Sequence, residues 1–307
     1  MSVPPITAMF PDASDLQLAS LDKLGGRPDW MTIREGIPDD AELVRRCQGH
    51  AAVLNNESYF TQDVLDQCPD LKVITFLGTG ASSYIDMDAC ARRGIVVRNV
   101  AGYGNRTVAE HATALMFAVF RDLGNQQEIM RRGGWGGSPI GELSGKTLGL
   151  VGLGGIGNEM AAIGKALGMR VIGWSRSPHP DCVAEPVSFT TVLAEADVLS
   201  LHLALTPDTS GMFDAAMLRR MKRGSVLINS ARGALVDEGA LVALLEEGHL
   251  AGAGLDVFAT EPLPADHPLR SAPNVVLSAH TGWQSPEAID RLMERAMGYL
   301  REEMDRL

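Results

Sequence analysis

The stretch Leu148-Gly149-Leu150-Val151-Gly152-Leu153-Gly154-Gly155-Ile156-Gly157 decides the fold of this chain. Four residues typical of a buried strand precede the pattern Gly-x-Gly-x-x-Gly, and a run with helical periodicity follows it. This order of strand, tight turn and helix is what a dinucleotide pyrophosphate requires. A second strand-like segment, 170–174, follows at the spacing of a βαβ unit. The stretch therefore predicts a dinucleotide-binding turn, and the alternative is a plain turn between a strand and a helix.

The glycines of this stretch have separate predicted tasks. Gly152 permits a turn that a Cβ would obstruct, and Gly154 lets the backbone approach the phosphates. Gly157 lets the helix pack close to the strand. Gly155 and Ile156 open the helix, whose N-terminus presents free N–H groups to the anion.

Composition limits the kinds of partner. The chain has 307 residues, which suggests two domains, and its net charge of −11 argues against nucleic acid and anionic membranes. No run of about 18 apolar residues indicates a membrane span, and the first residues lack the features of a signal peptide. The four cysteines are scattered without metal-ligand spacing. We therefore expect a cytoplasmic protein with a small-molecule ligand and no metal.

The order of strand and helix signals predicts the fold class α/β. Strands are predicted at 6–10, 51–54, 71–76 and 94–97, with helices at 15–24, 39–48, 61–68 and 86–93. After a long helix at 105–120, six strands are predicted at 149–152, 170–174, 197–203, 225–229, 253–257 and 275–278. Six is the number of a full doubly wound Rossmann sheet. We expect such a parallel sheet, preceded by a smaller flavodoxin-like α/β domain, with a boundary near residue 103.

Three polar residues follow predicted strands of the second half, namely Arg232, Glu261 and His280. Carboxyl ends of parallel strands meet at one sheet edge, so we expect these side chains beside the glycine turn. Each also has a structural interpretation: a solvated loop charge, a turn cap and a core histidine, respectively. In the first half, Thr79 and Gly80 follow a strand and can offer backbone N–H groups to a carboxylate, or they form a simple turn.

Several runs resemble signatures of the D-isomer-specific 2-hydroxyacid dehydrogenases. The chief one is Asn229-Ser230-Ala231-Arg232-Gly233-Ala234-Leu235-Val236-Asp237-Glu238-Gly239-Ala240-Leu241. The resemblance extends over nearly the whole chain, through segments 107–111, 145–147, 254–263, 267–269 and 273–275. His280-Thr281-Gly282-Trp283-Gln284 is similar to the glyoxylate and hydroxypyruvate reductase (glycerate dehydrogenase) members.

The resemblance implies a substrate domain built from residues 1–103 and 281–307, and a dinucleotide-binding domain at 104–280. It also implies that Arg232 clamps the substrate carboxylate, His280 protonates the carbonyl oxygen, and Glu261 bonds the other imidazole nitrogen. The chemistry agrees, because histidine titrates near neutrality and a guanidinium pairs bidentately with a carboxylate.

Further contacts are implied by the same resemblance. The substrate would meet Asn56, Thr79, Gly80, Arg232 and Trp283. Asp256 would lie near the nicotinamide carboxamide, and the remaining predicted cofactor contacts are His202, Thr209, Ser230, Ala231, Arg232, His280 and Gly282. Asn55 stands where phosphoglycerate-type members tend to carry arginine, which argues against a phosphorylated substrate.

The end of the second strand indicates which dinucleotide is used. NAD-binding folds place a carboxylate there for the ribose 2′-OH, but this chain has Trp174-Ser175-Arg176-Ser177. Ser175 can donate to the 2′-phosphate of NADP and Arg176 can pair with it. We therefore expect NADP(H) to be preferred, with NAD(H) possible.

The leading interpretation is an enzyme that transfers hydride from NADPH to a small 2-keto acid, such as glyoxylate or hydroxypyruvate, giving the D-2-hydroxy acid. One alternative is a non-catalytic, nucleotide-responsive protein resembling corepressors. Another is an NAD-dependent dehydrogenase of a different 2-hydroxy acid. The resemblance also implies a homodimer, with the 105–120 helix and its flanks as the candidate interface.

Overall fold

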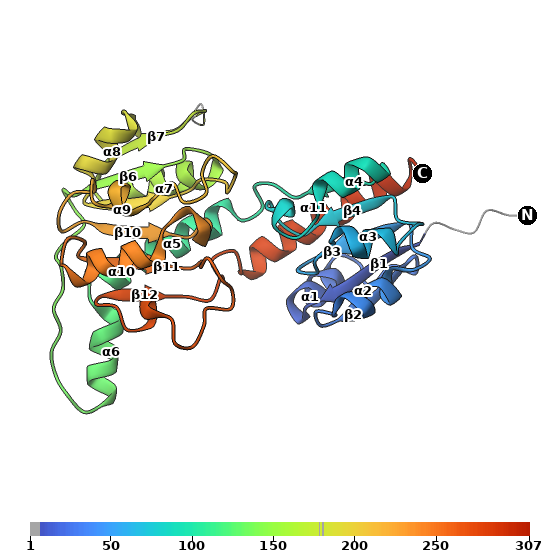
Figure 1. Cartoon of the computed structure of the whole chain (residues 1–307), viewed down its shortest axis with the longest axis horizontal. Coiled ribbons are helices and arrows are strands. Elements are labelled where there is room, and N and C mark those ends of the chain that lie inside the picture. Colours follow the sequence, from blue (N-terminus) through green and yellow to red (C-terminus); the bar gives the residue numbers. More distant parts are fainter. Residues whose placement is uncertain (1–6, 178, 180) are drawn as a thin grey trace, which may run out of the picture. The chain divides into compact units, whose positions relative to one another are not determined.

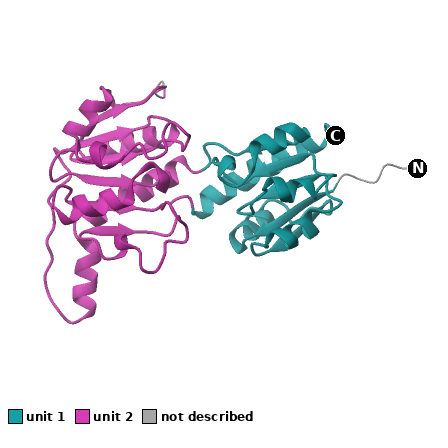
Figure 2. Cartoon of the chain, viewed as in Figure 1, with its two compact units in different colours: residues 1–103, 284–307 teal, residues 104–283 magenta. Residues whose placement is uncertain are grey.

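The computed structural model of the chain describes residues 7–177, 179 and 181–307 (Figure 1). The chain divides into two compact units (Figure 2). Unit 1 comprises the chain up to Tyr103 together with Gln284–Leu307, and unit 2 comprises Gly104–Trp283. We expected residues 281–283 in the substrate domain, but they lie in unit 2, where Thr281 and Gly282 donate backbone hydrogen bonds to Asp256.

Unit 1 is built on a five-stranded parallel sheet with the order β2-β1-β3-β4-β5, which is the flavodoxin-like order. The strands are β1 (Ala8–Ala13), β2 (Met31–Glu35), β3 (Ala52–Asn55), β4 (Val73–Phe76) and β5 (Val96–Asn99). Ile6, the first residue of a predicted strand, lies outside the described residues. Strand β2 was not predicted, because it is an edge strand whose last residues are exposed and charged.

The C-terminal helix completes unit 1. Helix α11 (Pro286–Met304) packs against α1 (Asp15–Lys23) and against β3 and β4. Its buried side chains repeat at helical spacing, from Ala288 and Ile289 to Leu300. The remaining helices are α2 (Asp40–Cys47), α3 (Gln62–Asp66) and α4 (Met87–Arg93), with the 3₁₀ turn η1 (Ala81–Ser83). Residues from both ends of the sequence therefore form one core.

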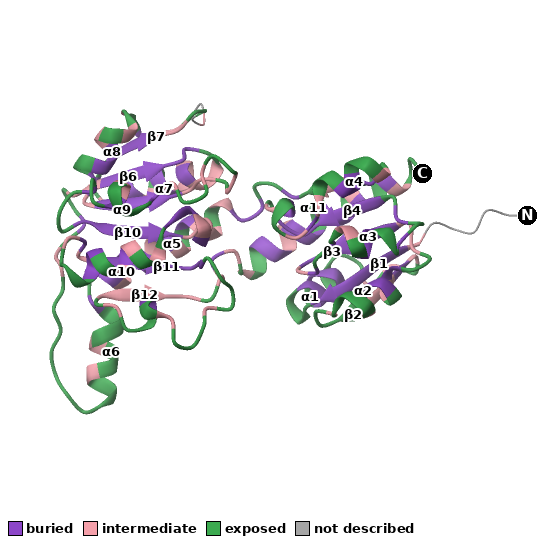
Figure 3. Ribbon diagram, in the orientation of Figure 1, coloured by how far each residue is buried: buried purple, intermediate pink, exposed green. Residues whose placement is uncertain are grey.

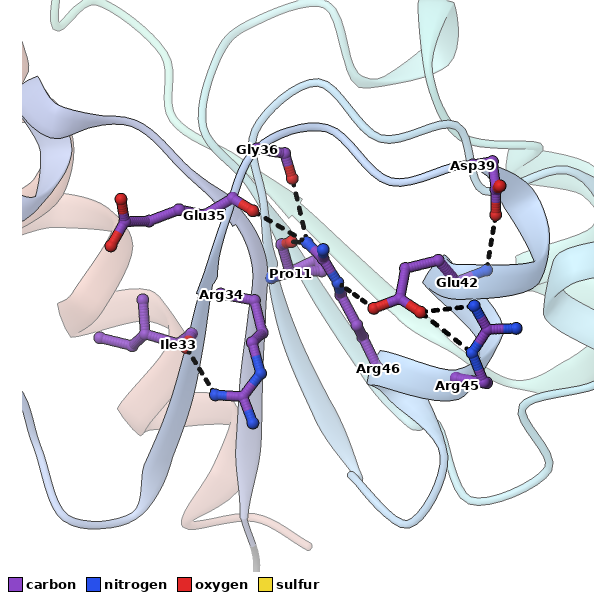
Figure 4. A network of polar contacts seen from close by, with 9 residues as sticks. All are labelled: Pro11, Ile33, Arg34, Glu35, Gly36, Asp39, Glu42, Arg45 and Arg46. Atoms are coloured by element: carbon purple, nitrogen blue, oxygen red, sulfur yellow. Dashed lines mark hydrogen bonds and ion pairs between the residues drawn. The ribbon is translucent and has the colours of Figure 1, made fainter.

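Arg46, on α2, links β1 to the end of β2 (Figure 4). Its Nη1 donates to the carbonyls of Pro11, Glu35 and Gly36, the last at 3.0 Å. Its Nε donates to Glu42 at 2.8 Å. The pKa of Glu42 lies below its usual range. The hydrogen bond from Arg46 is the largest cause, and the hydrogen bond from Arg45 is the second. The guanidinium thus satisfies carbonyls at the end of the edge strand β2, where no further ladder exists.

Unit 2 is built on a seven-stranded parallel sheet with the order β12-β11-β10-β9-β6-β7-β8. Its strands are β6 (Thr147–Val151), β7 (Arg170–Trp174), β8 (Glu185–Pro186), β9 (Val198–Leu201), β10 (Val226–Asn229), β11 (Gly252–Leu255) and β12 (Val275–Leu277). Counted from β6, this is the Rossmann order 3-2-1-4-5-6 with one strand added. The predicted fold class is confirmed. The prediction of six strands was wrong, because β8 is an edge strand of two exposed residues.

Helices cover both faces of this sheet. Helices α5 (Asn105–Phe120) and α7 (Gly155–Ala166) pack on one face. The other face carries α8 (Phe189–Glu195), α9 (Ala215–Leu218) and α10 (Glu238–Glu246), with the 3₁₀ turns η2 (Gly233–Leu235) and η3 (Pro268–Arg270) nearby.

Helix α6 (Leu123–Arg131) was not predicted and buries no residue, as Figure 3 shows. Among the described residues, no helix is both long and apolar enough to span a membrane.

Candidate active site

The turn between β6 and α7 has no room for side chains at two of its glycines. Gly152 adopts a φ of +99°, and a Cβ there would lie 2.4 Å from the carbonyl oxygen of His202. A Cβ on Gly157 would lie 2.1 Å from the carbonyl oxygen of Gly152. The close approach of strand and helix thus depends on the absence of both side chains.

The other two glycines differ from each other. A Cβ on Gly155 would lie 2.1 Å from Nδ2 of Asn105, so this glycine serves packing against α5. A Cβ on the exposed Gly154 would meet nothing within 4 Å, so packing within the chain does not require glycine there. It leaves the backbone open to a ligand at the N-terminus of α7, where Ile156 lies in the first turn and N–H groups are unpaired. These residues fit a dinucleotide pyrophosphate.

Ser175 and Arg176 follow β7. Ser175 is half-buried, and its Oγ accepts a hydrogen bond from the Ser177 N–H at 3.3 Å. Arg176 is exposed, and its guanidinium bonds none of the described residues. The guanidinium is therefore available to a ligand.

His202 follows β9 and lies beside the glycine turn. Its Nε2 bonds Ser200 Oγ at 3.0 Å, while its enclosed Nδ1 has no partner among the described residues. Burial lowers the pKa of His202 to about 4, so the ring is neutral at neutral pH. The Thr209 hydroxyl donates a hydrogen bond to the Ala204 carbonyl at 2.8 Å. Its proton is therefore engaged within the loop.

The loop after β10 presents Arg232. Asn229 shapes it, since its side chain accepts from the Ala231 N–H and donates to the Arg232 carbonyl, both at 3.0 Å. The enclosed hydroxyl of Ser230 has no partner among the described residues. Such an unpaired buried polar atom is costly, and a bound ligand would satisfy it.

Glu261 and His280 form a close pair. Nδ1 of His280 lies 2.7 Å from Oε2 of Glu261, and Oε1 of Glu261 accepts from the Phe258 N–H at 2.8 Å. Burial of the Glu261 carboxyl opposes ionisation, but the hydrogen bonds from His280 and Phe258 outweigh it and hold its pKa below the usual range. The charge of Arg232 acts in the same direction. An ionised Glu261 therefore accepts a hydrogen bond from Nδ1–H of His280 and leaves Nε2, the other ring nitrogen, available for proton transfer.

Asp256 holds the loop that carries His280, and this role was not predicted. Its carboxylate is 2% exposed. Oδ1 accepts from Ser278 Oγ at 2.6 Å and from the Thr281 N–H at 3.0 Å, while Oδ2 accepts from the Gly282 N–H at 2.9 Å. The Asp256 carbonyl accepts from the His280 N–H at 2.8 Å, and His280 has a φ of +53°.

His111 of α5 extends this network. Its Nε2 lies 2.8 Å from Ser278 Oγ and 3.3 Å from Asp256 Oδ1. Burial opposes ionisation of Asp256, but hydrogen bonds from His111, Ser278 and two backbone N–H groups outweigh it, so its pKa lies below the usual range. The segment 107–111 resembles the family, yet no local pattern connects His111 with Asp256.

The remaining predicted substrate contacts are divided between the two units. In unit 1, Asn56 is 7% exposed, and its Oδ1 accepts from Gln17 at 2.7 Å. The N–H groups of Thr79 and Gly80 donate to no described residue. Trp283, in unit 2, is half-buried. Their assignment to the substrate stays a prediction. Within the described residues, no group of three or more His, Cys, Asp or Glu is arranged to hold a metal ion.

The model of the D-isomer specific 2-hydroxyacid dehydrogenase NAD-binding domain matches residues 113–282, more than half of the chain. The chain belongs to this family. A glycerate dehydrogenase of Methylorubrum extorquens is 39% identical over 83% of this chain and 82% of its own length. A hydroxypyruvate reductase of Blautia hydrogenotrophica is 32% identical over 88% and 87%, respectively. A solved acyclic imino acid reductase in complex with NADPH and D-Arg is 27% identical, with a TM-score of 0.85 and 98% of both chains covered.

This D-2-hydroxyacid dehydrogenase is therefore an oxidoreductase of the 2-keto acid reductase type that uses a nicotinamide cofactor. The alternative of a non-catalytic, corepressor-like protein is not favoured.

Replacing Asp256 by Asn should lower the free energy of unfolding at neutral pH by about 2 kcal/mol, because the amide cannot serve every donor that the carboxylate serves. The pKa of Asp256 is depressed in the folded state. Its contribution is therefore present above the usual carboxyl pKa and is lost as pH falls through the folded-state value. Denaturant titrations at neutral and stepwise lower pH should show the difference between parent and variant closing in acid. Asp208→Asn, at an exposed position, is the control, and a difference that persists in acid would contradict this role.

Proposed function

We propose that this enzyme reduces a small 2-keto acid, such as hydroxypyruvate or glyoxylate, to the D-2-hydroxy acid, with NADPH as the preferred cofactor. The observation that carries the proposal is the 2.7 Å contact between Nδ1 of His280 and Oε2 of Glu261, with the positive charge of Arg232 acting on the same carboxylate. These residues supply a proton donor, a group that orients it and a carboxylate-binding cation.

The proposed chemistry divides among the three side chains. NADPH, when bound, supplies the hydride. Protonated His280 gives the proton on Nε2 to the carbonyl oxygen, and ionised Glu261 fixes the ring through Nδ1 and stabilises its cationic form. Arg232 pairs with the substrate carboxylate and polarises the adjacent carbonyl.

The substrate is proposed to be small and without a phosphate. The names of the two relatives, glycerate dehydrogenase and hydroxypyruvate reductase, support hydroxypyruvate as the keto acid and glycerate as the hydroxy acid. Asn55, at the position where phosphoglycerate-type members tend to carry arginine, is fully buried and donates to the Ser58 carbonyl at 3.0 Å. This contact within the loop supports a substrate without a phosphate.

The preference for NADPH rests on the residues after β7. A carboxylate there would repel the 2′-phosphate, and residues 175–177 contain none. The exposed Arg176 guanidinium is free to pair with that phosphate, and Ser175 can donate to it. The NADPH complex of the imino acid reductase supports use of this cofactor on the same fold.

The protein is further proposed to be a cytoplasmic homodimer. Its four cysteines are unpaired, which supports a reducing compartment. We expected the interface at α5 and its flanks; because the apolar side chains of α5 are mostly buried within unit 2, we centre the proposed interface on the flanking segment. In this segment, Leu123, Met130 and Trp135 are 51%, 52% and 90% exposed. Large exposed apolar side chains gathered in one segment are typical of an interface.

His280→Ala should lower kcat for 2-keto acid reduction by about 1,000-fold, because the proton donor is lost, and should leave NADPH affinity nearly unchanged. Nicotinamide absorbance with hydroxypyruvate or glyoxylate measures turnover, and fluorescence titration measures binding. A parent enzyme inactive on every small 2-keto acid would refute the proposed function. Loss of NADPH binding in the variant would instead make His280 structural.

Arg176→Ala should reduce kcat/KM for NADPH by about 10- to 100-fold, since one charge-assisted phosphate contact is removed, and should leave kcat/KM for NADH unchanged. Steady-state kinetics with both cofactors measure this. Arg220→Ala, at another exposed arginine of unit 2, is the matched control. The preference is wrong if the parent uses NADH as well as or better than NADPH.

The double change Leu123→Asp and Met130→Asp should convert a dimer into a monomer, because two charges would be desolvated at the interface. Sedimentation velocity of parent and variant measures the mass. Leu24→Asp introduces a charge at a comparably exposed leucine of unit 1, at 45%, and should leave the mass unchanged. A monomeric parent, or a variant that stays dimeric, would contradict the proposed interface.

A further inference from the structure

Glu238 is a poorly exposed carboxylate to which the proposed chemistry gives no task. It is the first residue of α10, and its side chain is 13% exposed. It belongs to the signature run that begins at Asn229, and its two partners lie in the segments 254–263 and 267–269. It therefore joins three segments that resemble the family but are separate in the sequence.

Both oxygens of Glu238 have partners. Oε1 accepts from the Ala259 N–H at 2.8 Å, and Oε2 lies 3.2 Å from Nε2 of His267. Nδ1 of His267 accepts from the Leu269 N–H at 3.3 Å. Because Nδ1 is an acceptor, the ring proton lies on Nε2, where it donates to Glu238.

Ala259 lies two residues before Glu261, in the loop that presents the catalytic pair. The neighbouring Phe258 N–H donates to Glu261 Oε1 at 2.8 Å. This backbone also packs against the loop of Arg232, since a Cβ on Gly233 would lie 1.9 Å from the Phe258 carbonyl carbon. A shift of the backbone at 258–259 would therefore displace Glu261 and press on the segment after Arg232.

We propose that Glu238 is a positioning residue, which fixes the backbone at Phe258-Ala259 and, through it, the carboxylate of Glu261 that orients His280. This inference rests on the proposed function, because the oriented imidazole is the proposed proton donor. Glu238 touches neither substrate nor cofactor in this role. His267 holds the carboxylate of Glu238 in the position that meets the Ala259 N–H.

The first test compares Glu238→Ala, Glu238→Gln and the control Glu246→Ala, at an exposed glutamate of the same helix. Glu238→Ala should lower kcat for hydroxypyruvate reduction by about 10-fold and leave KM and affinity for NADPH unchanged. Glu238→Gln should restore part of kcat, because its amide oxygen can accept from the Ala259 N–H, although its NH₂ group then faces the Nε2–H donor of His267. Thermal denaturation verifies that each variant is folded at the assay temperature. Equal activity of Glu238→Ala and the parent, or no recovery in Glu238→Gln, would overturn the proposal.

A double-mutant cycle tests whether Glu238 acts through Glu261. Adding Glu238→Ala to Glu261→Gln should change kcat little, because the carboxylate that Glu238 positions is already gone. The same 10-fold loss in both backgrounds would overturn the proposal.

Hydrogen exchange by mass spectrometry gives a readout independent of turnover. Glu238→Ala should accelerate exchange in a peptide spanning 258–262 and leave peptides of β10 unchanged. An inactive parent would refute the proposed function alone, and exchange would then decide the positioning role. Unchanged exchange at 258–262 would overturn it.

Discussion

The buried carboxylate of Asp256 is the constraint on which the position of His280, the proposed proton donor, depends. The carboxylate accepts hydrogen bonds from the N–H groups of Thr281 and Gly282, and the Asp256 backbone carbonyl accepts one from the His280 N–H. These bonds hold His280 at a positive φ that residues with a Cβ seldom adopt. An enclosed carboxylate is costly unless its lone pairs are used, and here the loop backbone uses them. The imidazole is thus placed by main-chain hydrogen bonds before any substrate is present.

The parallel sheet brings the other groups to the same edge. Strands β6, β10, β11 and β12 all end there, so the loops that follow them carry the glycine turn, Arg232, Glu261 and His280. Close packing then removes freedom from these loops. Gly152 and Gly157 let α7 approach β6, and Gly233 lets the segment after Arg232 lie against the Phe258 backbone. Each of these contacts is short enough that a methyl group would force the backbone apart.

The sequence predicted elements well where apolar periodicity is strong and poorly where it is weak. Helix α5 was predicted to the residue, because its apolar stripe is continuous. Strands β2 and β8 were missed because they are edge strands that carry charged or exposed residues. Helix α6 was missed for a related reason, since no side chain in it is buried within the chain and no core selects an apolar face.

The sequence by itself determined the glycine turn, the parallel α/β class and the strand-end positions of Arg232, Glu261 and His280, because each depends on a local pattern of a few residues. Only the tertiary structure decided how these side chains are held. The bonds of Asp256 to the His280 loop and of Glu238 to Ala259 join residues far apart in the chain. No local pattern encodes such contacts, since they exist only when separate strands have paired and their loops have met.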